Sequence, residues 1–478
     1  MSSFTHPAAM LGERVWSRPS VVVGGHGFAR RACQAMVLLP LFSLVLLPEY
    51  VQGLGDPGSK SILYRASVGP LRVLDLLLLA VIAAHGVAWA SSRRLRVHMP
   101  RTLMAPGVGF MASIALAMIY GLLHGGVNLF FDWRALALGV GTYVVFALWV
   151  QTAEQARWAM VLFAAYMGLH IVLMYAQFLR GGGDVIVGVR VPVFDGPTLS
   201  AIVFTAVLAL WMVDASNVWW HKLLLIGLSA GAYLMVLLCF RRTFWAELGV
   251  ATVLLLILRK RGRGQKLLLA LGALVAVAAM LGPTFRERVR SMNFAAGETE
   301  FSQDNPDHVG EVLDAWDQVQ RNPVVGIGLG RSFQTLRIQD WKEESVMVHN
   351  GPLHVWLKYG LMGLVCYVWF HVALFRWLYQ RLRAPSGVHP AAYFRGLKSV
   401  RKIEGSAAFG TAEAVPLQNL TPEAAGAGAA LTYLAAQFAV TLGFTPWPYS
   451  SMQSTPLIAF VLAIAMTGTT SCECQAFR

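Results

Sequence analysis

Five side chains in this sequence have the chemistry of phosphate binding and proton transfer. Arg241 and Arg242 are adjacent, Arg286 and Arg288 lie further along, and His349 follows a long polar stretch. Arginine offers a planar, permanently charged fork that fits phosphate oxygens, so two such groups facing one cleft suit a diphosphate. Histidine takes up a proton near neutral pH. These residues indicate displacement of a diphosphate by a hydroxyl, with His349 as general base.

Four more polar residues are candidates for contacts with substrate or acceptor: Arg190, Asp195, Glu247 and Asn350. Plainer interpretations stay open for them. Asp195 either binds a sugar hydroxyl or shapes a turn, and Glu247 either contacts substrate or pairs with Arg242. The arginines have the alternative of reaching lipid headgroup phosphates. Neither the five cysteines nor the polar residues near His349 show the spacing of a metal site, so we expect no metal and no cofactor.

The elements that must position these residues are membrane-spanning helices. The chain has 478 residues, 56% hydrophobic and 13% charged, whereas ordinary globular domains carry about a quarter charged residues. Its apolar runs reach the ~20 residues that cross a bilayer. The sequence predicts an all-α, polytopic bundle of about twelve spans with a large, partly helical periplasmic loop. The predicted spans lie near 32–51, 70–90, 103–123, 135–152, 158–178, 198–213, 223–240, 243–258, 267–282, 353–379, 425–445 and 453–469.

The distribution of basic residues predicts the orientation. They gather in three loops, near 93–101, 259–266 and 381–402, which an even span count places on one side with both termini. That side is the cytoplasm by the positive-inside rule, so the net charge of +14 needs no nucleic-acid partner. The predicted regions are a cytoplasmic tail at 1–31, spans one to nine within 32–282, a periplasmic loop at 283–352, span ten at 353–379, a basic cytoplasmic loop at 380–424, the last two spans within 425–469 and a tail at 470–478.

The periplasmic loop contains one expected helix. Apolar residues recur at helical spacing from Val309 to Gln320, and Asn322-Pro323 stops the pattern. We expect an amphipathic helix that lies on the membrane domain. The glycine run from Gly326 to Gly330 does not follow the dinucleotide-binding pattern, and no strand precedes it.

Four signatures in this order resemble the O-antigen ligase and polysaccharide polymerase superfamily of bacterial inner-membrane proteins. They are Arg190 with Phe194-Asp195-Gly196-Pro197, then Arg242-Thr243 at a span end, Trp316 with Asn322-Pro323-Val324-Val325-Gly326-Ile327-Gly328-Leu329-Gly330, and His349-Asn350 followed by Gly360-Leu361-Met362-Gly363-Leu364. They cover about residues 185 to 365, and the last two are the most specific.

By this resemblance the donor is an undecaprenyl-diphosphate-linked glycan at the periplasmic face, and the acceptor is a growing glycan, the lipid A core or a protein hydroxyl. The resemblance assigns diphosphate contacts to Arg242 and Arg288 and the role of base to His349. Arg241 can share the role of Arg242, because Phe240-Arg241 replaces the usual small residue. An arginine often found before the loop tryptophan is replaced by Glu311 and Asp314. A transporter or flippase for polysaccharide lipids is the rival function.

Overall fold

The computed structural model describes residues 100–150, 152–186, 189–192, 196–259, 305–337, 348–383, 422–442 and 454–466, with short pieces between 67 and 83, at 272 and at 344–345. The predicted span near 32–51, all but residue 272 of the one near 267–282, and most of the one near 70–90 lie outside the described residues.

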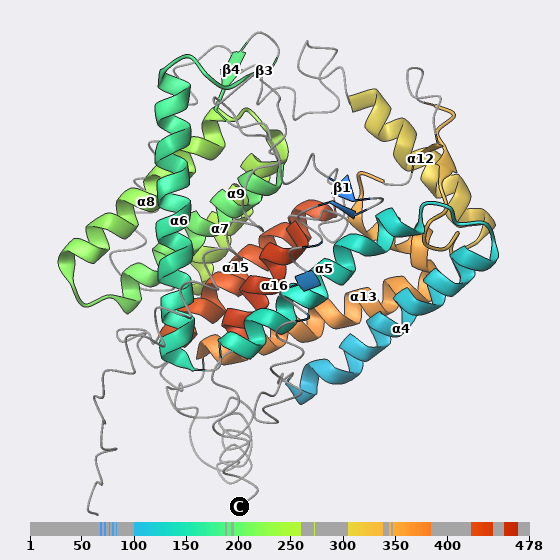
Figure 1. Ribbon diagram of the computed structural model, residues 1–478, viewed down its shortest axis with the longest axis horizontal. Helices are drawn as coiled ribbons and strands as arrows, with labels where there is room; N and C mark the ends of the chain where they lie inside the picture. The colour runs from blue at the N-terminus through green and yellow to red at the C-terminus, as the bar shows by residue number, and fades with distance from the viewer. Residues whose placement is uncertain are drawn as a thin grey trace, which may run out of the picture.

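The described chain is a helical bundle (Figure 1). Its helices are α4 Arg101–Leu123, α5 Leu129–Trp149, α6 Ala153–Leu179, α7 Gly196–Ala215, α8 Trp219–Leu238, α9 Arg242–Leu258, α12 Asn305–Arg321, α13 Gly351–Arg383, α15 Pro422–Thr441 and α16 Ser454–Met466. Three antiparallel strand pairs join β1 Ser67–Val68 to β2 Leu71–Arg72, β3 Asp184–Ile186 to β4 Val189–Val191, and β5 Phe333–Gln334 to β6 Glu344–Ser345.

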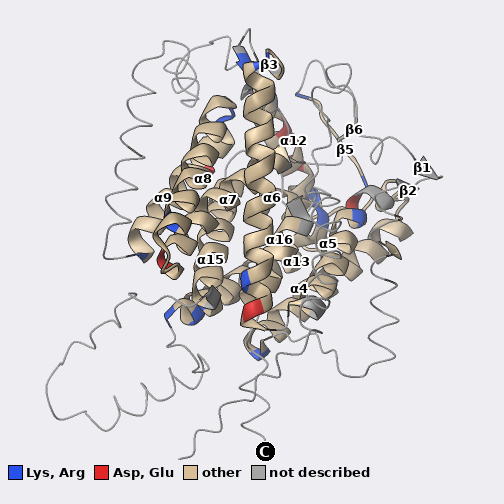
Figure 2. Cartoon of the chain, turned by 60° about the vertical axis from the view of Figure 1, so that its left-hand side comes forward, with Lys and Arg blue, Asp and Glu red and all other residues tan. Residues whose placement is uncertain are grey.

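The predicted fold class, a polytopic helical membrane bundle, is confirmed. Six of the described helices, α4, α6, α7, α8, α13 and α15, are long and apolar enough to cross a bilayer, and α16 contains a shorter apolar helix. Helices α4 to α9, α13, α15 and α16 overlap nine of the twelve predicted spans. Figure 2 shows that the described helices carry few charged residues along most of their length.

Helix α15 lies at the centre of the bundle and packs against α7, α9, α13 and α16. Its sequence is rich in alanine and glycine, which lets neighbouring backbones approach closely. Trp211 of α7 lies so near Gly428 that a Cβ atom there would come within 2.8 Å of the indole ring. The indole nitrogen of Trp211 also donates a hydrogen bond to Thr432 at 3.2 Å. Small residues therefore allow large aromatic side chains to fill the core.

His349, Arg241 and Arg242 lie at one end of the bundle, which we call the His349 end. Gln437 of α15 links Ser200 near the start of α7 to Glu247 near the start of α9, through bonds of 2.5 and 2.8 Å. At the opposite end of α7 and α9, Arg259 pairs with Asp214 at 2.5 Å. Helices α7 and α9 therefore run parallel, and their starts lie at the His349 end.

The glycine run at 326–330 clamps three helices together at this end. The backbone N–H of Ile327 donates to Leu357 of α13 at 2.7 Å, and that of Leu329 donates to Ala117 of α4 at 3.0 Å. The N–H of Gly330 donates to the carboxylate of Asp132 in α5 at 2.8 Å. The run is thus an architectural turn, in agreement with its departure from the dinucleotide-binding pattern.

A buried charge pair completes this clamp. The Lys358 ammonium donates to Asp132 at 2.9 Å and to the backbone oxygen of Arg331 at 2.5 Å. Lys358 lies just before Gly360, where α13 leaves helical geometry with a φ of 68°. The N–H of Leu361, beyond this interruption, donates to Pro323 at 3.0 Å. Backbone groups before the interruption are therefore bonded to the clamp, and the N–H of Leu361 after it is bonded to Pro323, just before the clamp.

The helix expected from Val309 to Gln320 corresponds to α12, which packs against α13 and ends directly before Asn322 (Figure 1). The face expected to lie on the membrane domain was wrong in part. Val309, Leu313 and Trp316 are exposed, whereas Val319 is buried. Two carboxylates take the inner positions, since Glu311 is 3% and Asp314 4% exposed. The buried face of α12 is therefore partly acidic.

Candidate functional site at the start of helix α13

His349 stands beside a buried carboxylate. Its Nδ1 atom lies 2.7 Å from Oε2 of Glu311, and its backbone N–H donates to the same oxygen at 3.2 Å. The Glu311 side chain is 3% exposed, while that of His349 is 29% exposed. When Nδ1 carries the proton and donates it to the carboxylate, Nε2 keeps the lone pair of the ring. This arrangement can hold a histidine in one orientation while it accepts a proton from a neighbouring hydroxyl.

Asn350 has a structural task that the sequence analysis did not foresee. Its side-chain oxygen accepts the N–H of Leu353 at 3.0 Å, the bond by which an asparagine caps a helix start. Its side-chain nitrogen donates to the backbone oxygen of Leu442 at 3.2 Å, at the end of α15. The buried His354 accepts the N–H of Val348 at 3.4 Å through Nδ1. These bonds fix the backbone on either side of His349.

Arg241 and Arg242 lie in the tight turn between α8 and α9. Arg242 is the first residue of α9, and the carbonyl of Arg241 accepts the N–H groups of Phe244 and Trp245, both at 3.2 Å. Phe240 in this turn has a φ of 53°, a conformation that bulky residues rarely adopt. Because α8 ends and α9 begins in this turn, their helix dipoles oppose one another, and the positive charge comes from the two guanidinium groups. The turn can therefore hold an anion.

We call the turn that contains Arg241 and Arg242 the arginine turn. It lies at the same level along the helix axes as His349. Glu247 follows Arg242 by five residues, and Gln437, which bonds Glu247, precedes Leu442 by five residues. Helices α7 and α15 are antiparallel, because Ser200 bonds Tyr433 while Trp211 bonds Thr432 and contacts Gly428. Because α9 is parallel to α7, Arg242 lies about 7.5 Å beyond Glu247 along the helix axis, in the direction of the His349 end. Leu442 lies about 7.5 Å beyond Gln437 in the same direction.

The remaining predicted site residues divide into described and undescribed ones. Glu247 is 3% exposed and accepts its bond from Gln437, so the structure shows a partner other than the expected Arg242. Arg190 lies on the exposed face of β4, opposite Val185 of β3. Asp195, Arg286 and Arg288 lie outside the described residues. Gly196, next to Asp195, would place a Cβ 3.6 Å from Phe244, so the chain after Asp195 approaches the arginine turn.

A group with metal-ligand chemistry was missed by the sequence analysis. His308, Glu311 and His349 each offer one ligand atom, and these atoms lie within 4.8 Å of one another. His308 and Glu311 are three residues apart, which places them on one face of α12. The sequence feature that could have revealed this group is the spacing of His308 and Glu311, together with a histidine at the start of the next helix.

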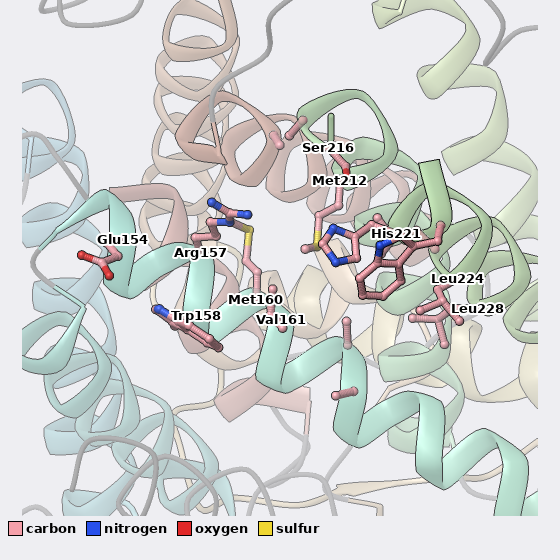
Figure 3. A pocket seen from close by; sticks show the side chains of 16 residues that line it. Glu154, Arg157, Trp158, Met160, Val161, Met212, Ser216, His221, Leu224 and Leu228 are labelled. Carbon is pink, nitrogen blue, oxygen red and sulfur yellow. The ribbon is translucent and has the colours of Figure 1, made fainter. Parts of the chain in front are cut away.

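A separate cavity lies at the opposite end of the bundle (Figure 3). It has a volume of about 630 Å³ and lies between the start of α6, the end of α7 and the start of α8. Figure 3 shows Glu154 and Arg157 on one side and Met212 and His221 on the other. Among the predicted site residues that the structure describes, none lines this cavity.

Two comparisons with known proteins give related results. Residues 223–368 match a protein-family model described as O-antigen ligase. That range contains the arginine turn, Glu247, α12 and His349. The chain is also 26% identical over 185 residues to a curated protein of Salmonella typhimurium named O-antigen ligase. The alignment covers 36% of this chain and 44% of that relative, so it spans less than half of the relative's length.

Proposed function

We propose, from the premise that the chain belongs to the O-antigen ligase-like superfamily, that it is a glycosyltransferase of the bacterial inner membrane. It moves a glycan from an undecaprenyl-diphosphate carrier to a hydroxyl acceptor at the periplasmic face. The acceptor is a growing glycan, the lipid A core or a protein hydroxyl. The reaction proceeds without a metal. The arginines bind the diphosphate, and His349 is the general base.

The observation that carries this proposal is the pairing of His349 with Glu311 at 2.7 Å, at the same end of the bundle as the arginine turn. A base and an anion site at one end of a membrane bundle suit a donor whose lipid lies in the bilayer and whose diphosphate lies at its surface. The arginine turn is where the seventh and eighth predicted spans meet, so it places two cations at the expected boundary of the bilayer.

In the proposed reaction the acceptor oxygen attacks the anomeric carbon of the donor. The new carbon–oxygen bond forms as the bond between that carbon and the diphosphate oxygen breaks, and undecaprenyl diphosphate leaves with both bonding electrons. The hydroxyl proton passes to Nε2 of His349, and Glu311 stabilises the imidazolium. A single displacement inverts the anomeric configuration. Arg241 and Arg242 stabilise the charge that develops on the leaving diphosphate.

The rival transporter function requires charged residues or broken helices deep in the membrane. In the described chain, Glu247 and Arg134 are buried charged residues within α9 and α5, and α13 is interrupted at Gly360 beside the buried Lys358. There the Lys358 ammonium already bonds Asp132 and a backbone oxygen, and the clamp covers the break. These contacts favour a structural role for the break over an ion or substrate path.

A transfer assay on the purified protein tests the proposal. The assay contains detergent, a lipid-diphosphate glycan, EDTA and one acceptor class at a time. We expect His349→Ala to lower kcat by about 10²- to 10⁴-fold, the usual contribution of a general base, and Arg242→Ala by roughly 10²-fold. Arg180→Ala, which changes an exposed arginine at the end of α6, is the matched control and keeps full activity.

The acceptor that becomes labelled identifies the reaction. Longer glycans on the carrier identify a polymerase, and glycan on lipid A core identifies a ligase. Glycan on a protein hydroxyl identifies an oligosaccharyltransferase. Full activity of both site variants at equal folded yield would overturn the site. No transfer by folded wild type with any acceptor would favour the transporter.

A further inference from the structure

We propose that His308, Glu311 and His349 form a Zn²⁺ site, and that bound Zn²⁺ withdraws the His349 imidazole from the transfer reaction. The site joins two elements that are distant in sequence. His308 and Glu311 project from the first turns of α12, and His349 precedes α13. One ligand atom of each residue lies within 4.8 Å of the other two. The inhibitory part of this inference rests on the proposed role of His349.

The ligand set fits Zn²⁺ better than it fits a hard cation. Two imidazole nitrogens and one carboxylate oxygen match the three protein ligands of many zinc sites, which leave a fourth position for water. Mg²⁺ and Ca²⁺ prefer sites built from oxygen atoms alone. Zinc bonds of about 2.0–2.1 Å hold tetrahedral ligands roughly 3.3 Å apart. His349 Nδ1 and Glu311 Oε2 are 2.7 Å apart, so small side-chain rotations can open the site for an ion.

The environment of the three side chains favours such an ion. Glu311 is a carboxylate with 3% exposure, and its known partners in the described chain are the ring and the backbone N–H of His349. The imidazole rings of His308 and His349 lie side by side, with centroids 4.7 Å apart and planes inclined by 52°. A divalent cation would satisfy all three groups together, and it would neutralise the buried carboxylate.

A substitution of His308 can weaken zinc binding without removing the contact that orients the proposed base. The contact between His349 and Glu311 is complete without it, because Glu311 bonds both the ring and the backbone of His349. His308 therefore adds a third ligand without being needed to orient the base. A neutral imidazole has one lone pair on its ring nitrogens. Once zinc takes that pair, the other ring nitrogen carries the proton, and the ring can no longer accept one from a hydroxyl.

Zinc binding is measured first, without donor or acceptor. Purified wild type in detergent competes with a chromophoric zinc chelator for ZnCl₂, and MgCl₂ is tested as the contrasting ion. We expect zinc to bind wild type saturably and His308→Gln at least about tenfold more weakly, a change on the scale of losing an outer-shell partner or more. His124→Gln is the matched control, because His124 is an exposed histidine at the end of α4. Equal zinc affinity in wild type and His308→Gln would overturn the site.

Occupation of His349 is measured next, by its modification with diethyl pyrocarbonate and mass spectrometry. We expect zinc to slow the modification of His349 in wild type and in His124→Gln. In His308→Gln, the same zinc concentration should reduce the modification rate by a factor at least about ten times smaller. Unchanged modification of His349 in zinc-loaded wild type would contradict the proposal, whatever the activity of the protein.

The transfer assay then tests inhibition. With each protein compared with its own zinc-free rate, His308→Gln should require at least about tenfold more zinc for half inhibition than wild type, and EDTA should restore each zinc-free rate. Activation by zinc, or equal inhibition of both proteins, would overturn the inhibitory role. Absence of transfer in zinc-free wild type would instead count against the proposed function, while the binding and modification results still decide the zinc site.

Discussion

Oε2 of Glu311 accepts two bonds from one residue, from Nδ1 of His349 at 2.7 Å and from its backbone N–H at 3.2 Å. This carboxylate orients the ring and would stabilise its protonated form. We predict that Glu311→Gln lowers kcat by about 10²- to 10⁴-fold, on the scale of general-base catalysis, with little change in the KM for donor. Initial rates over a range of donor concentrations and pH values check this.

Asp317→Asn is the control for that experiment, because Asp317 is a half-exposed carboxylate of the same helix whose described ion pair is with Arg337. It should leave kcat near the wild-type value. A fall in folded yield that accounts for the whole loss of activity in Glu311→Gln would show a structural role only.

The clamp at 326–330 requires glycine at particular positions. Gly328 has a φ of 86°, and a Cβ atom there would come within 2.7 Å of the backbone nitrogen of Gly121. We predict that Gly328→Ala lowers the free energy of unfolding by more than the ~1–3 kcal/mol that such a backbone conformation costs alone. The matched variant is Gly249→Ala in α9, where nothing lies within 4 Å and alanine favours the helix by up to ~1 kcal/mol. Apparent Tm values in detergent distinguish the two, and equal values would contradict the prediction.

Removal of one member of the buried pair of Lys358 and Asp132 should destabilise the protein strongly. The Lys358 side chain is fully buried, and Asp132 is 11% exposed. Removal of one partner of a buried pair leaves the other charge without compensation, at a cost of about 3–5 kcal/mol. We predict this loss for Lys358→Met, and a smaller loss for the double variant Lys358→Met with Asp132→Asn. Denaturation in detergent measures both, and a double variant that loses as much stability as Lys358→Met or more would contradict the prediction.

Asp314 should contribute more than Arg337 to holding the segment after α12 against that helix. Asp314 is buried and accepts the N–H groups of Leu336 and Arg337 at 2.7 and 2.9 Å. Arg337 is exposed, and its hydrogen bond to Asp317, with the nearby charges of both carboxylates, raises its pKa. We predict that Asp314→Asn costs roughly 1.5–3 kcal/mol, the scale of hydrogen bonds to charged groups, and that Arg337→Met costs less.

Limited proteolysis between α12 and α13 compares these two variants. Cleavage should accelerate in Asp314→Asn before it does in Arg337→Met. The opposite order would mean that the exposed ion pairs, and not the backbone bonds to Asp314, hold this segment.

Local patterns predicted the helices well and the pairing of residues poorly. Apolar runs located nine described helices, and the proline at 323 marked the end of α12. The face of α12 was misjudged because periodicity rules assume that apolar side chains avoid the outside. Here Leu313 and Trp316 face outward while Glu311 faces inward, where its carboxylate bonds His349.

The contacts around the site depend on pairs that no local pattern contains. Glu311 and His349 are 38 positions apart, and Lys358 and Asp132 are 226 positions apart. His349 was identified from its residue type and its place before a span. Its carboxylate partner was not, because Glu311 resembled one of many acids in a polar loop until the fold brought the two together.

The bond from Asn350 to Leu442 has a consequence for the order in which the chain assembles. Asp132, Ala117 and Leu357 precede α15 in the sequence, so a growing chain has all the partners of the clamp before α15 is made. The carbonyl of Leu442 becomes available only after α15 itself has been synthesised. The start of α13 thus gains this anchor late, and a chain that has not reached Leu442 holds His349 through Glu311 but lacks the carbonyl to which the Asn350 amide nitrogen donates.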